Sequence, residues 1–192
     1  MKRLSIYLCA IALAAGVALA PVYAQSQAKT PANTSNAHET ERITRQVRHE
    51  LVMLPYYGLF DNLEFRVNGG TVTLMGQVTR PTLKSDAENV VKPIEGVTKV
   101  ENQIQVLPLS PMDDRIRLAT YRAIYSQPGL ERYALQAVPP IHIIVANGKV
   151  TLEGVVATQA DKDRAGIQAN GVSGVFSVTN NLRVENSGHG GK

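Results

Sequence analysis

Two short stretches of the chain share one alternation of apolar and polar residues, with a glycine at the same point of each. The first reads Val-Thr-Leu-Met-Gly-Gln-Val at 72–78, and the second reads Val-Thr-Leu-Glu-Gly-Val-Val at 150–156. Their glycines, Gly76 and Gly154, lie 78 positions apart. The same offset relates three further pairs, Gly96 to Gly174, Val100 to Val178 and Asn102 to Asn180. A register that is kept over this distance predicts two copies of one small domain.

Each copy is predicted to fold in the order α-β-β-α-β. In the first copy, helical spacing and strict alternation of apolar residues place a helix over 42–54, strands over 63–67 and 71–78, a helix over 81–94 and a strand over 97–106. In the second copy, the same patterns place a helix over 111–126, strands over 141–145 and 149–156, a helix over 159–169 and a strand over 175–184. The predicted fold class is α+β, with a three-stranded mixed sheet covered by two helices in each domain.

The domain boundaries follow from these elements: domain one over 41–107, a short stiff linker over 108–112 and domain two over 113–185. The copies differ mainly at 127–140, where the second has a longer insert of the kind that surface loops tolerate. Each copy has only about seventy residues, a size at which apolar burial is marginal. Because the linker is also short, we expect the two domains to pack against each other.

Four glycines are predicted to have structural roles. Gly76 and Gly154 interrupt the inward-facing side of a strand, which indicates a bulge or the close approach of another backbone, most simply that of a crossing helix. Gly96, together with Glu95, is expected to end the second helix of the first copy, and Gly174 is the equivalent residue of the second copy.

Asn102 and Asn180 lie on a strand face that is otherwise apolar. A buried amide needs hydrogen-bond partners, so we expect both side chains to be satisfied locally. An asparagine side chain readily replaces a missing backbone partner at a bend, which predicts a structural role.

Residues 1–24 have the pattern of a secretory signal peptide. A positively charged start precedes an apolar run over 6–19 and a small-residue cleavage site at 22–24. Cleavage after Ala20 is the alternative, but it would leave a proline next to the cleaved bond. The single cysteine, Cys9, lies within this segment. The mature chain is therefore expected to have no disulfide and no cysteine metal site.

The segments that flank the domains are polar. Residues 25–40 are predicted to form a flexible leader, and 186–192 a disordered tail. The whole chain has 20 basic and 16 acidic side chains, and loss of Lys2 and Arg3 with the signal peptide leaves a net charge of only +2. A balance this close to neutral gives no support to nucleic-acid binding.

The sequence shows no arrangement typical of a reactive centre. The four histidines are not at metal-ligand spacing from one another: His38, His49, His142 and His189. Asp113 and Asp114 stand at a helix start, where carboxylates favour the positive end of the helix dipole. The sequence also lacks a serine nucleophile elbow and a phosphate-binding glycine loop. We therefore expect a protein that is not an enzyme and that binds no cofactor or metal.

The repeated patterns resemble the BON domain family, which is named after bacterial osmotically inducible and nodulation proteins. The resemblance rests on the element order, on the strands at 72–78 and 150–156, and on the Gly-Val-x-x-Val-x-Asn segments that begin the stretches 96–106 and 174–184. It covers nearly all of the mature chain, and the tandem arrangement behind a signal peptide is similar to that of the periplasmic two-domain members. The resemblance implies a non-enzymatic module of the bacterial envelope, associated with stress and with anionic phospholipid or other envelope surfaces.

The candidate binding surface is basic and aromatic. It comprises residues of the first helix of each copy: Arg42, Arg45, Arg48, Arg115, Arg117, Arg122, Tyr121 and Tyr125. Arginine and tyrosine suit the headgroup level of an anionic bilayer. In the alternative interpretation, the arginines solvate the helix faces and the tyrosines pack between the copies. The loop with Tyr56, Tyr57 and Phe60 poses a similar choice between a membrane anchor and a lid over the core.

Two functional hypotheses follow. The first is a periplasmic module that docks reversibly on anionic phospholipid, without a transmembrane span in the mature chain. The second is a protein-interaction or chaperone-like adaptor, in which an exposed sheet edge or the groove between the copies takes a protein partner. A preference for anionic over neutral vesicles favours the first hypothesis. Recovery of lipid-free protein complexes by crosslinking in intact cells favours the second.

Overall fold

The computed structural model of the protein describes residues 31–136 and 138–185, with side chains from residue 36 onward. The predicted signal peptide and the predicted tail lie outside the described residues. The first domain contains, in order, α1 (Pro31–Val52), β1 (Asn62–Asn68), β2 (Thr71–Val78), α2 (Pro81–Val91), β3 (Lys99–Asn102) and β4 (Gln105–Val106). The second contains α3 (Pro111–Tyr125), the 3₁₀ helix η1 (Glu131–Leu135), β5 (Ile141–Ala146), β6 (Lys149–Val156), α4 (Gln159–Asn170), β7 (Ser177–Asn180) and β8 (Arg183–Val184).

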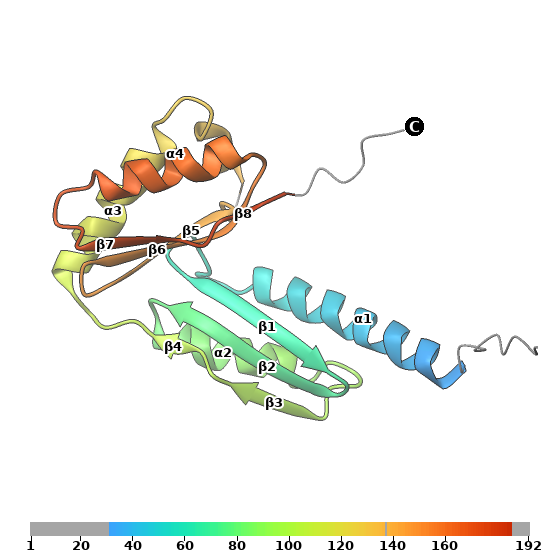
Figure 1. Cartoon of the computed structure of the whole chain (residues 1–192). Coiled ribbons are helices and arrows are strands. Elements are labelled where there is room, and N and C mark those ends of the chain that lie inside the picture. The colour runs from blue at the N-terminus through green and yellow to red at the C-terminus, as the bar shows by residue number, and fades with distance from the viewer. Residues whose placement is uncertain (1–30, 137, 186–192) are drawn as a thin grey trace, which may run out of the picture.

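The middle strand of each domain holds its sheet together. β1 pairs antiparallel with β2, and β5 pairs antiparallel with β6, each across a two-residue turn. The short last strands pair parallel with β2 in domain one and with β6 in domain two. Figure 1 shows the two helices of each domain on one face of its sheet. The predicted α+β class and the duplication are therefore confirmed.

The third predicted strand of each copy is interrupted just after its asparagine. Opposite this point the middle strand has its glycine, Gly76 with a φ of 109° or Gly154 with a φ of 119°. Such a backbone departs from regular strand geometry, so the strand pairing stops and restarts after a gap of two residues. The Ile104 N–H donates instead to Oδ1 of Asn102 at 3.2 Å, and domain two repeats this bond at Asn180.

The close approach expected at Gly76 and Gly154 comes from the neighbouring strand. A Cβ at Gly76 would overlap the carbonyl oxygen of Asn62, and a Cβ at Gly154 would overlap that of Pro140. The explanation by a crossing helix is therefore wrong, because the backbone at the start of the hairpin lies against each glycine. Both glycines also have a positive φ, which any side chain would make unfavourable.

α1 begins at Pro31, well before the predicted start at 42. Residues 31–40, which were expected to belong to the flexible leader, form the first turns of this helix. Proline is favoured at the first helical position, and no glycine or further proline follows before Val52. The polar composition of these turns hides the helix from a search based on apolar periodicity.

The insert at 127–140 contributes to the core of domain two and is more than a surface loop. Leu130 and Tyr133 are buried within that core. The Tyr133 hydroxyl accepts the Ala157 N–H at 2.8 Å and donates to Asp161 at 2.9 Å. The insert therefore supplies apolar surface and hydrogen bonds to domain two.

The two domains pack against each other through the loop between α1 and β1, as expected. The Ile143 N–H on the edge of β5 donates to the Leu59 carbonyl oxygen at 2.7 Å. Leu59 and Phe60 also pack against the core of domain two. The Tyr57 ring stacks on His142 with 5.7 Å between the ring centroids. Tyr57, Leu59 and Phe60 thus join the domains, whereas Tyr56 of the same loop is 73% exposed.

Candidate functional site

The outer face of α3 presents two arginines and a leucine to solvent. The helix starts at Pro111, where the Ser110 hydroxyl accepts the Asp113 N–H at 3.2 Å. Its inner face is buried, so residues three or four positions apart line up on the opposite face. These exposed residues are Arg115, Leu118 and Arg122.

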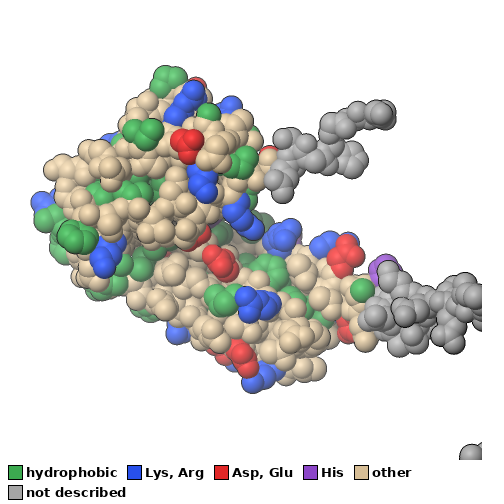
Figure 2. Space-filling model, viewed as in Figure 1, with side chains coloured by type: hydrophobic (Ala, Val, Ile, Leu, Met, Phe, Trp, Pro, Cys, Tyr) green, Lys and Arg blue, Asp and Glu red, His purple; other side chains and the backbone are tan. Residues whose placement is uncertain are grey.

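Apolar side chains lie exposed in the linker and at the start of the same helix. Leu109 is 95% exposed, and Met112 and Leu118 are about half exposed. A groove of about 360 Å³ borders Leu109 and Leu118 and includes Phe60 on its wall. Figure 2 shows apolar side chains gathered at the end of the molecule where the linker meets domain two. We call the following set the α3 surface: Leu109, Met112, Arg115, Leu118 and Arg122.

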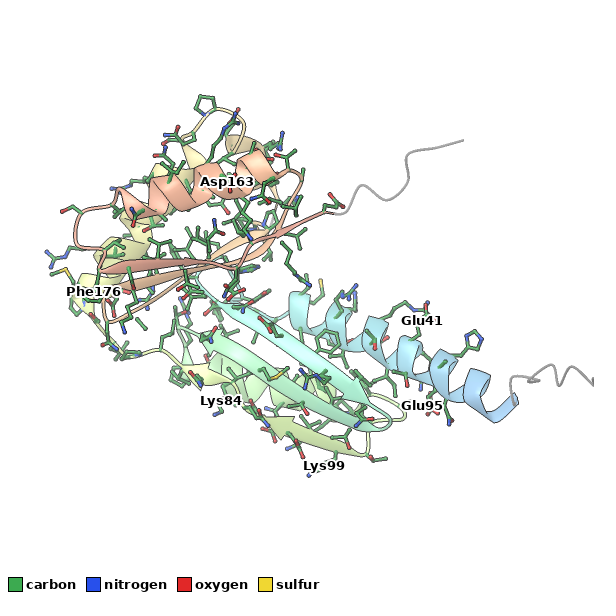
Figure 3. The ribbon with its side chains drawn as sticks, viewed as in Figure 1. Glu41, Lys84, Glu95, Lys99, Asp163 and Phe176 are labelled. Carbon is green, nitrogen blue, oxygen red and sulfur yellow. The ribbon has the colours of Figure 1, made fainter. Side chains whose placement is uncertain are left out.

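Phe176 adds a further exposed ring at this end of domain two (Figure 3). It is 80% exposed, and its N–H donates to the Gly148 carbonyl oxygen at 2.8 Å. The Gly148 N–H in turn donates to Asp113 in the first turn of α3 at 2.8 Å. These bonds place Phe176 close to the start of α3.

Arg117 was predicted to belong to the binding surface, but it is buried. Its side chain is only 5% exposed, and its guanidinium pairs with Asp114 and donates to the Val145 carbonyl oxygen at 2.7 Å. Arg117 therefore ties α3 to β5 and is not available to a headgroup. Sequence reasoning failed here because it treated every arginine as solvated, whereas a guanidinium can be buried when it has hydrogen-bond partners.

The two tyrosines of α3 pack inside domain two. The Tyr125 hydroxyl donates to the Ile141 carbonyl oxygen at 2.9 Å, and burial raises the pKa of Tyr125 above its ordinary value. The Tyr121 ring lies 5.0 Å from the Tyr125 ring and packs against the same core. The predicted surface position is therefore wrong for Tyr125, which is buried, whereas Tyr121 is half-buried.

The three predicted arginines of α1 are exposed, but each has different neighbours. Arg42 donates to the Glu95 carbonyl oxygen at 2.9 Å, next to the glycine turn that follows α2. Arg45 pairs with Glu41 at 3.1 Å on the exposed side of the helix. Arg48 lines a groove between the domains. Figure 1 shows α1 and α3 on opposite sides of the molecule, so the two sets of arginines are not brought together.

Gly96 and Gly174 each lie against the first helix of their own domain. Both have a φ of 86° in the turn after the second helix. A Cβ at Gly96 would stand 3.0 Å from Ile43 on α1, and a Cβ at Gly174 would contact Ile116 on α3 at 3.7 Å. Space is therefore tighter at Gly96 than at its counterpart.

A groove of about 770 Å³ lies between the two domains. Its walls are formed by α1, by β1, and by residues from β5, β6 and the β7–β8 segment. Three arginines line it: Arg48, Arg66 and Arg183. It also holds two acids, of which Glu64 accepts from the Asn62 amide at 2.8 Å and Glu153 from the Asn181 amide at 2.6 Å. Figure 2 shows basic and acidic side chains along the hollow between the two lobes.

His142 lies on the domain-two side of this groove. Burial lowers the pKa of His142, although the nearby backbone of Asp61 and Gly58 opposes the shift. Burial also raises the pKa of its stacking partner Tyr57 to about 12. Both rings are therefore uncharged at neutral pH, which suits a packed domain interface.

The described residues do not form a metal site or a membrane span. They contain no cluster of three or more His, Cys, Asp and Glu side chains that is placed to hold a metal ion. Within the same residues, every helix is too short or too polar to pass through a bilayer.

Sequence reasoning missed the exposed apolar residues of the α3 surface. The sequence pattern did indicate that Leu118 is exposed, because helical spacing places it on the opposite face of α3 from the inward residues Ile116 and Ile124. The pattern also indicated that Leu109 is exposed, because it stands in a linker between two prolines and belongs to no predicted helix or strand.

The BON domain family profile matches residues 39–108 and 128–186. These matches cover more than half of the chain, so the protein belongs to the BON domain family and contains two copies of the domain. The second match begins after α3, the helix that carries most of the α3 surface.

A curated relative matches the chain over almost its whole length. The chain is 30% identical to Osmotically-inducible protein Y of Escherichia coli (strain K12) over 201 aligned residues, which cover 96% of this chain and 99% of the relative. Solved structures that match include CdsD, a structural protein of the type III secretion system of Chlamydia trachomatis, with 15% identity, coverage of 77% of this chain and 95% of that chain, and a TM-score of 0.29. The C-terminal domain of CdsD matches with 14% identity, coverage of 73% and 96%, and a TM-score of 0.25.

Proposed function

We propose that the protein is a non-enzymatic module of the bacterial envelope that docks reversibly on anionic phospholipid through the α3 surface. The observation that carries this proposal is the exposure of Leu109, Met112 and Leu118 beside Arg115 and Arg122. Scattered apolar residues are ordinary on protein surfaces, but a group of them framed by cations is typical of an interaction site.

The chemistry of the α3 surface suits a phospholipid headgroup region. Each arginine near an anionic bilayer contributes on the order of 1 kcal/mol of attraction. Exposed leucine and methionine side chains enter the boundary between headgroups and acyl chains, where their burial adds to binding. The exposed ring of Phe176 at the same end of domain two extends this apolar contact.

Export and stress are proposed on separate grounds. The predicted signal peptide over 1–24 supports a periplasmic location. Similarity to a protein named for its osmotic induction supports expression under osmotic stress. Membership of the BON family supports a binding role without catalysis.

Vesicle co-sedimentation tests the docking proposal directly. The chain without its signal peptide is mixed with phosphatidylglycerol or phosphatidylcholine vesicles at low ionic strength. We expect sedimentation with the anionic vesicles and its loss in the double variant Arg115→Glu/Arg122→Glu. Leu109→Ser/Leu118→Ser is expected to weaken binding while leaving the charge unchanged. Arg117 is left out of these variants because its replacement would destabilise domain two.

The matched control is Arg45→Glu/Arg164→Glu, which changes the net charge by the same amount at two exposed positions outside the α3 surface. It should sediment like the wild type. Equal sedimentation with neutral vesicles, or equal losses in the two charge-reversal variants, would refute docking by this surface.

A further inference from the structure

The edge strands β1 and β5 are equivalent in the duplication, but among the described residues only the edge of β5 forms a backbone–backbone hydrogen bond to another segment. Because a two-residue turn follows each strand, alternate residues direct their N–H and C=O groups away from the middle strand. In β5 one of these residues is Ile143, and its N–H donates to the Leu59 carbonyl oxygen of domain one at 2.7 Å. The edge of β5 therefore binds the backbone of another segment.

The equivalent residue of β1 is Phe65, followed by Val67 at the next outward position. Within the described ranges, no other segment hydrogen-bonds the backbone of either residue at this edge. At the third outward position, Leu63, the backbone lies beside the Tyr57 hydroxyl and affects the pKa of that group. The edge of β1 is thus open along the part of the strand nearest its turn.

The side chains at these positions differ in the same way between the domains. Outward-edge residues of β5 are fully buried, in a core to which the insert contributes Leu130 and Tyr133. Domain one has no such insert. Its outward-edge side chains are only half-buried and line the groove between the domains, together with Leu51 and Val52 of α1. The groove therefore offers apolar surface directly beside an open strand edge.

The charges of the groove favour an acidic occupant. Its arginines, Arg48, Arg66 and Arg183, form no ion pair within the part of the chain that the structure describes. The two glutamates of the groove are bound by the neutral amides of asparagines instead. Carboxylates supplied by a ligand would meet three guanidinium groups with which to pair.

We propose that the edge of β1 binds an extended peptide segment of a partner protein in which acidic and apolar residues alternate. The segment adds a strand to the sheet of domain one. Its backbone bonds to the outward groups of Phe65 and Val67, its apolar side chains cover the half-buried β1 residues, and its carboxylates meet the arginines. Such strand addition takes affinity from the main chain and specificity from alternate side chains. This site is separate from the α3 surface, so it stands or falls independently of lipid docking.

A labelled synthetic peptide tests the site. The probe has about eight residues of alternating valine and glutamate, enough to span a typical strand. Fluorescence polarisation with the chain lacking only its signal peptide should show saturable binding. A valine–lysine peptide should bind at least about tenfold more weakly, a difference of about 1.4 kcal/mol. Of two probes N-methylated at odd or at even positions, one should lose binding, because only one set of N–H groups faces β1. Hydrogen exchange should slow at residues 65–67 when the probe binds.

Protein variants locate the bound probe. Arg66→Glu and Arg183→Glu should each weaken binding by about tenfold, whereas Arg164→Glu, an exposed position on α4, should leave it unchanged. Circular dichroism confirms that the variants are folded. Equal binding by both N-methylated probes, or equal effects of all three substitutions, would overturn the proposal.

Other occupants of the groove give distinct results. If phosphatidylglycerol vesicles displace the probe and Arg66→Glu abolishes vesicle binding, the groove is a headgroup site. If a chain ending at residue 185 binds the probe at least about tenfold more tightly, the chain's own tail occupies the groove. If the protein dimerises and Arg66→Glu prevents this, the occupant is a second copy. Each of these results would replace the proposed partner peptide.

Discussion

Asn102 and Asn180 hold equivalent positions in the two domains and share two hydrogen bonds. Nδ2 of Asn102 donates to the Lys84 carbonyl oxygen, and Nδ2 of Asn180 donates to the Lys162 carbonyl oxygen, each at 2.7 Å. The Oδ1 of each side chain accepts the N–H two residues further on, where the strand is interrupted. The prediction of local satisfaction is confirmed, and each asparagine also ties its sheet to the second helix.

Replacing Asn180 by alanine should therefore destabilise domain two. The variant leaves the Leu182 N–H and the Lys162 carbonyl oxygen without these partners, and each buried loss of this kind costs about 1–3 kcal/mol. Urea unfolding followed by circular dichroism measures the change in the free energy of unfolding. Asn89→Ala, at an exposed position on α2, is the control and should change that free energy by less than about 0.5 kcal/mol. Equal effects at the two sites would show that the asparagine bonds contribute nothing.

Gly76→Ala and Gly154→Ala should destabilise the protein more than alanine at any other described glycine. Each new Cβ overlaps a carbonyl oxygen of the neighbouring strand, at a φ that disfavours every side chain. Backbone strain alone costs about 1–3 kcal/mol, and the overlap adds to it. Thermal unfolding should show a lower Tm for both variants. Gly58→Ala is the matched control, because a Cβ there meets no atom within 4 Å. An unchanged Tm in Gly76→Ala would contradict this explanation of the glycine.

Tyr133→Phe removes one hydroxyl from the insert and should cost about 1–3 kcal/mol of stability. The reason is that the hydroxyl accepts the Ala157 N–H and donates to Asp161. Burial would raise the pKa of Asp161, but hydrogen bonds from Thr158 and Tyr133 and the charge of Arg132 hold it below its ordinary value. Urea unfolding provides the measurement. Tyr56→Phe, at an exposed residue, provides the control. If neither substitution changes the free energy of unfolding, the hydrogen bonds of the insert do not stabilise domain two.

The stability of the protein should fall as the pH drops below about 6.5, the ordinary pKa of histidine. Burial lowers the pKa of His142, so the folded state takes up a proton less readily than the unfolded chain. The neutral imidazole of His142 therefore makes its full contribution to the free energy of unfolding above about pH 6.5. This contribution is lost as the pH falls toward the pKa of His142 in the folded protein, which is the lower of the two pKa values. His142→Phe keeps a ring against Tyr57 and removes the titration. Its Tm should fall less between about pH 7.5 and 5.5 than that of the wild type.

His49→Gln is the control for this measurement, because His49 is exposed on α1. Its pH dependence should match the wild type. If the Tm of His142→Phe and the Tm of the wild type decrease by the same amount on acidification, the titration of His142 does not determine acid stability.

The fold could be predicted because its signals are local. Strand alternation, the turn Asn147-Gly148 and the repeated glycines depend on neighbours along the chain, and duplication shows each of them twice. The helix start at Ser110 is equally local. The early start of α1 at Pro31 escaped because polar turns carry no apolar period.

The binding surface could be predicted only in part because burial is decided by contacts distant in sequence. Arg117 and Tyr125 are buried through bonds to Val145 and Ile141, on a strand that follows the long insert. Helical periodicity alone does not distinguish a solvated arginine from one that bonds a buried carbonyl. The opening beside β1 was equally hidden, because the edge of β5 is bound by a loop of the other domain, and none of the described segments binds the backbone of Phe65 or Val67 in the same way.

The contact between Leu59 and Ile143 is heterologous: a loop of one copy meets the strand edge of the next. Repeated from molecule to molecule, a joint of this type would produce an open-ended filament. Propagation would need the corresponding segment of the second copy to reach β1 of a neighbouring molecule. That segment is folded into the core of domain two through Leu130 and Tyr133, so it is not free to reach a neighbouring molecule in this way.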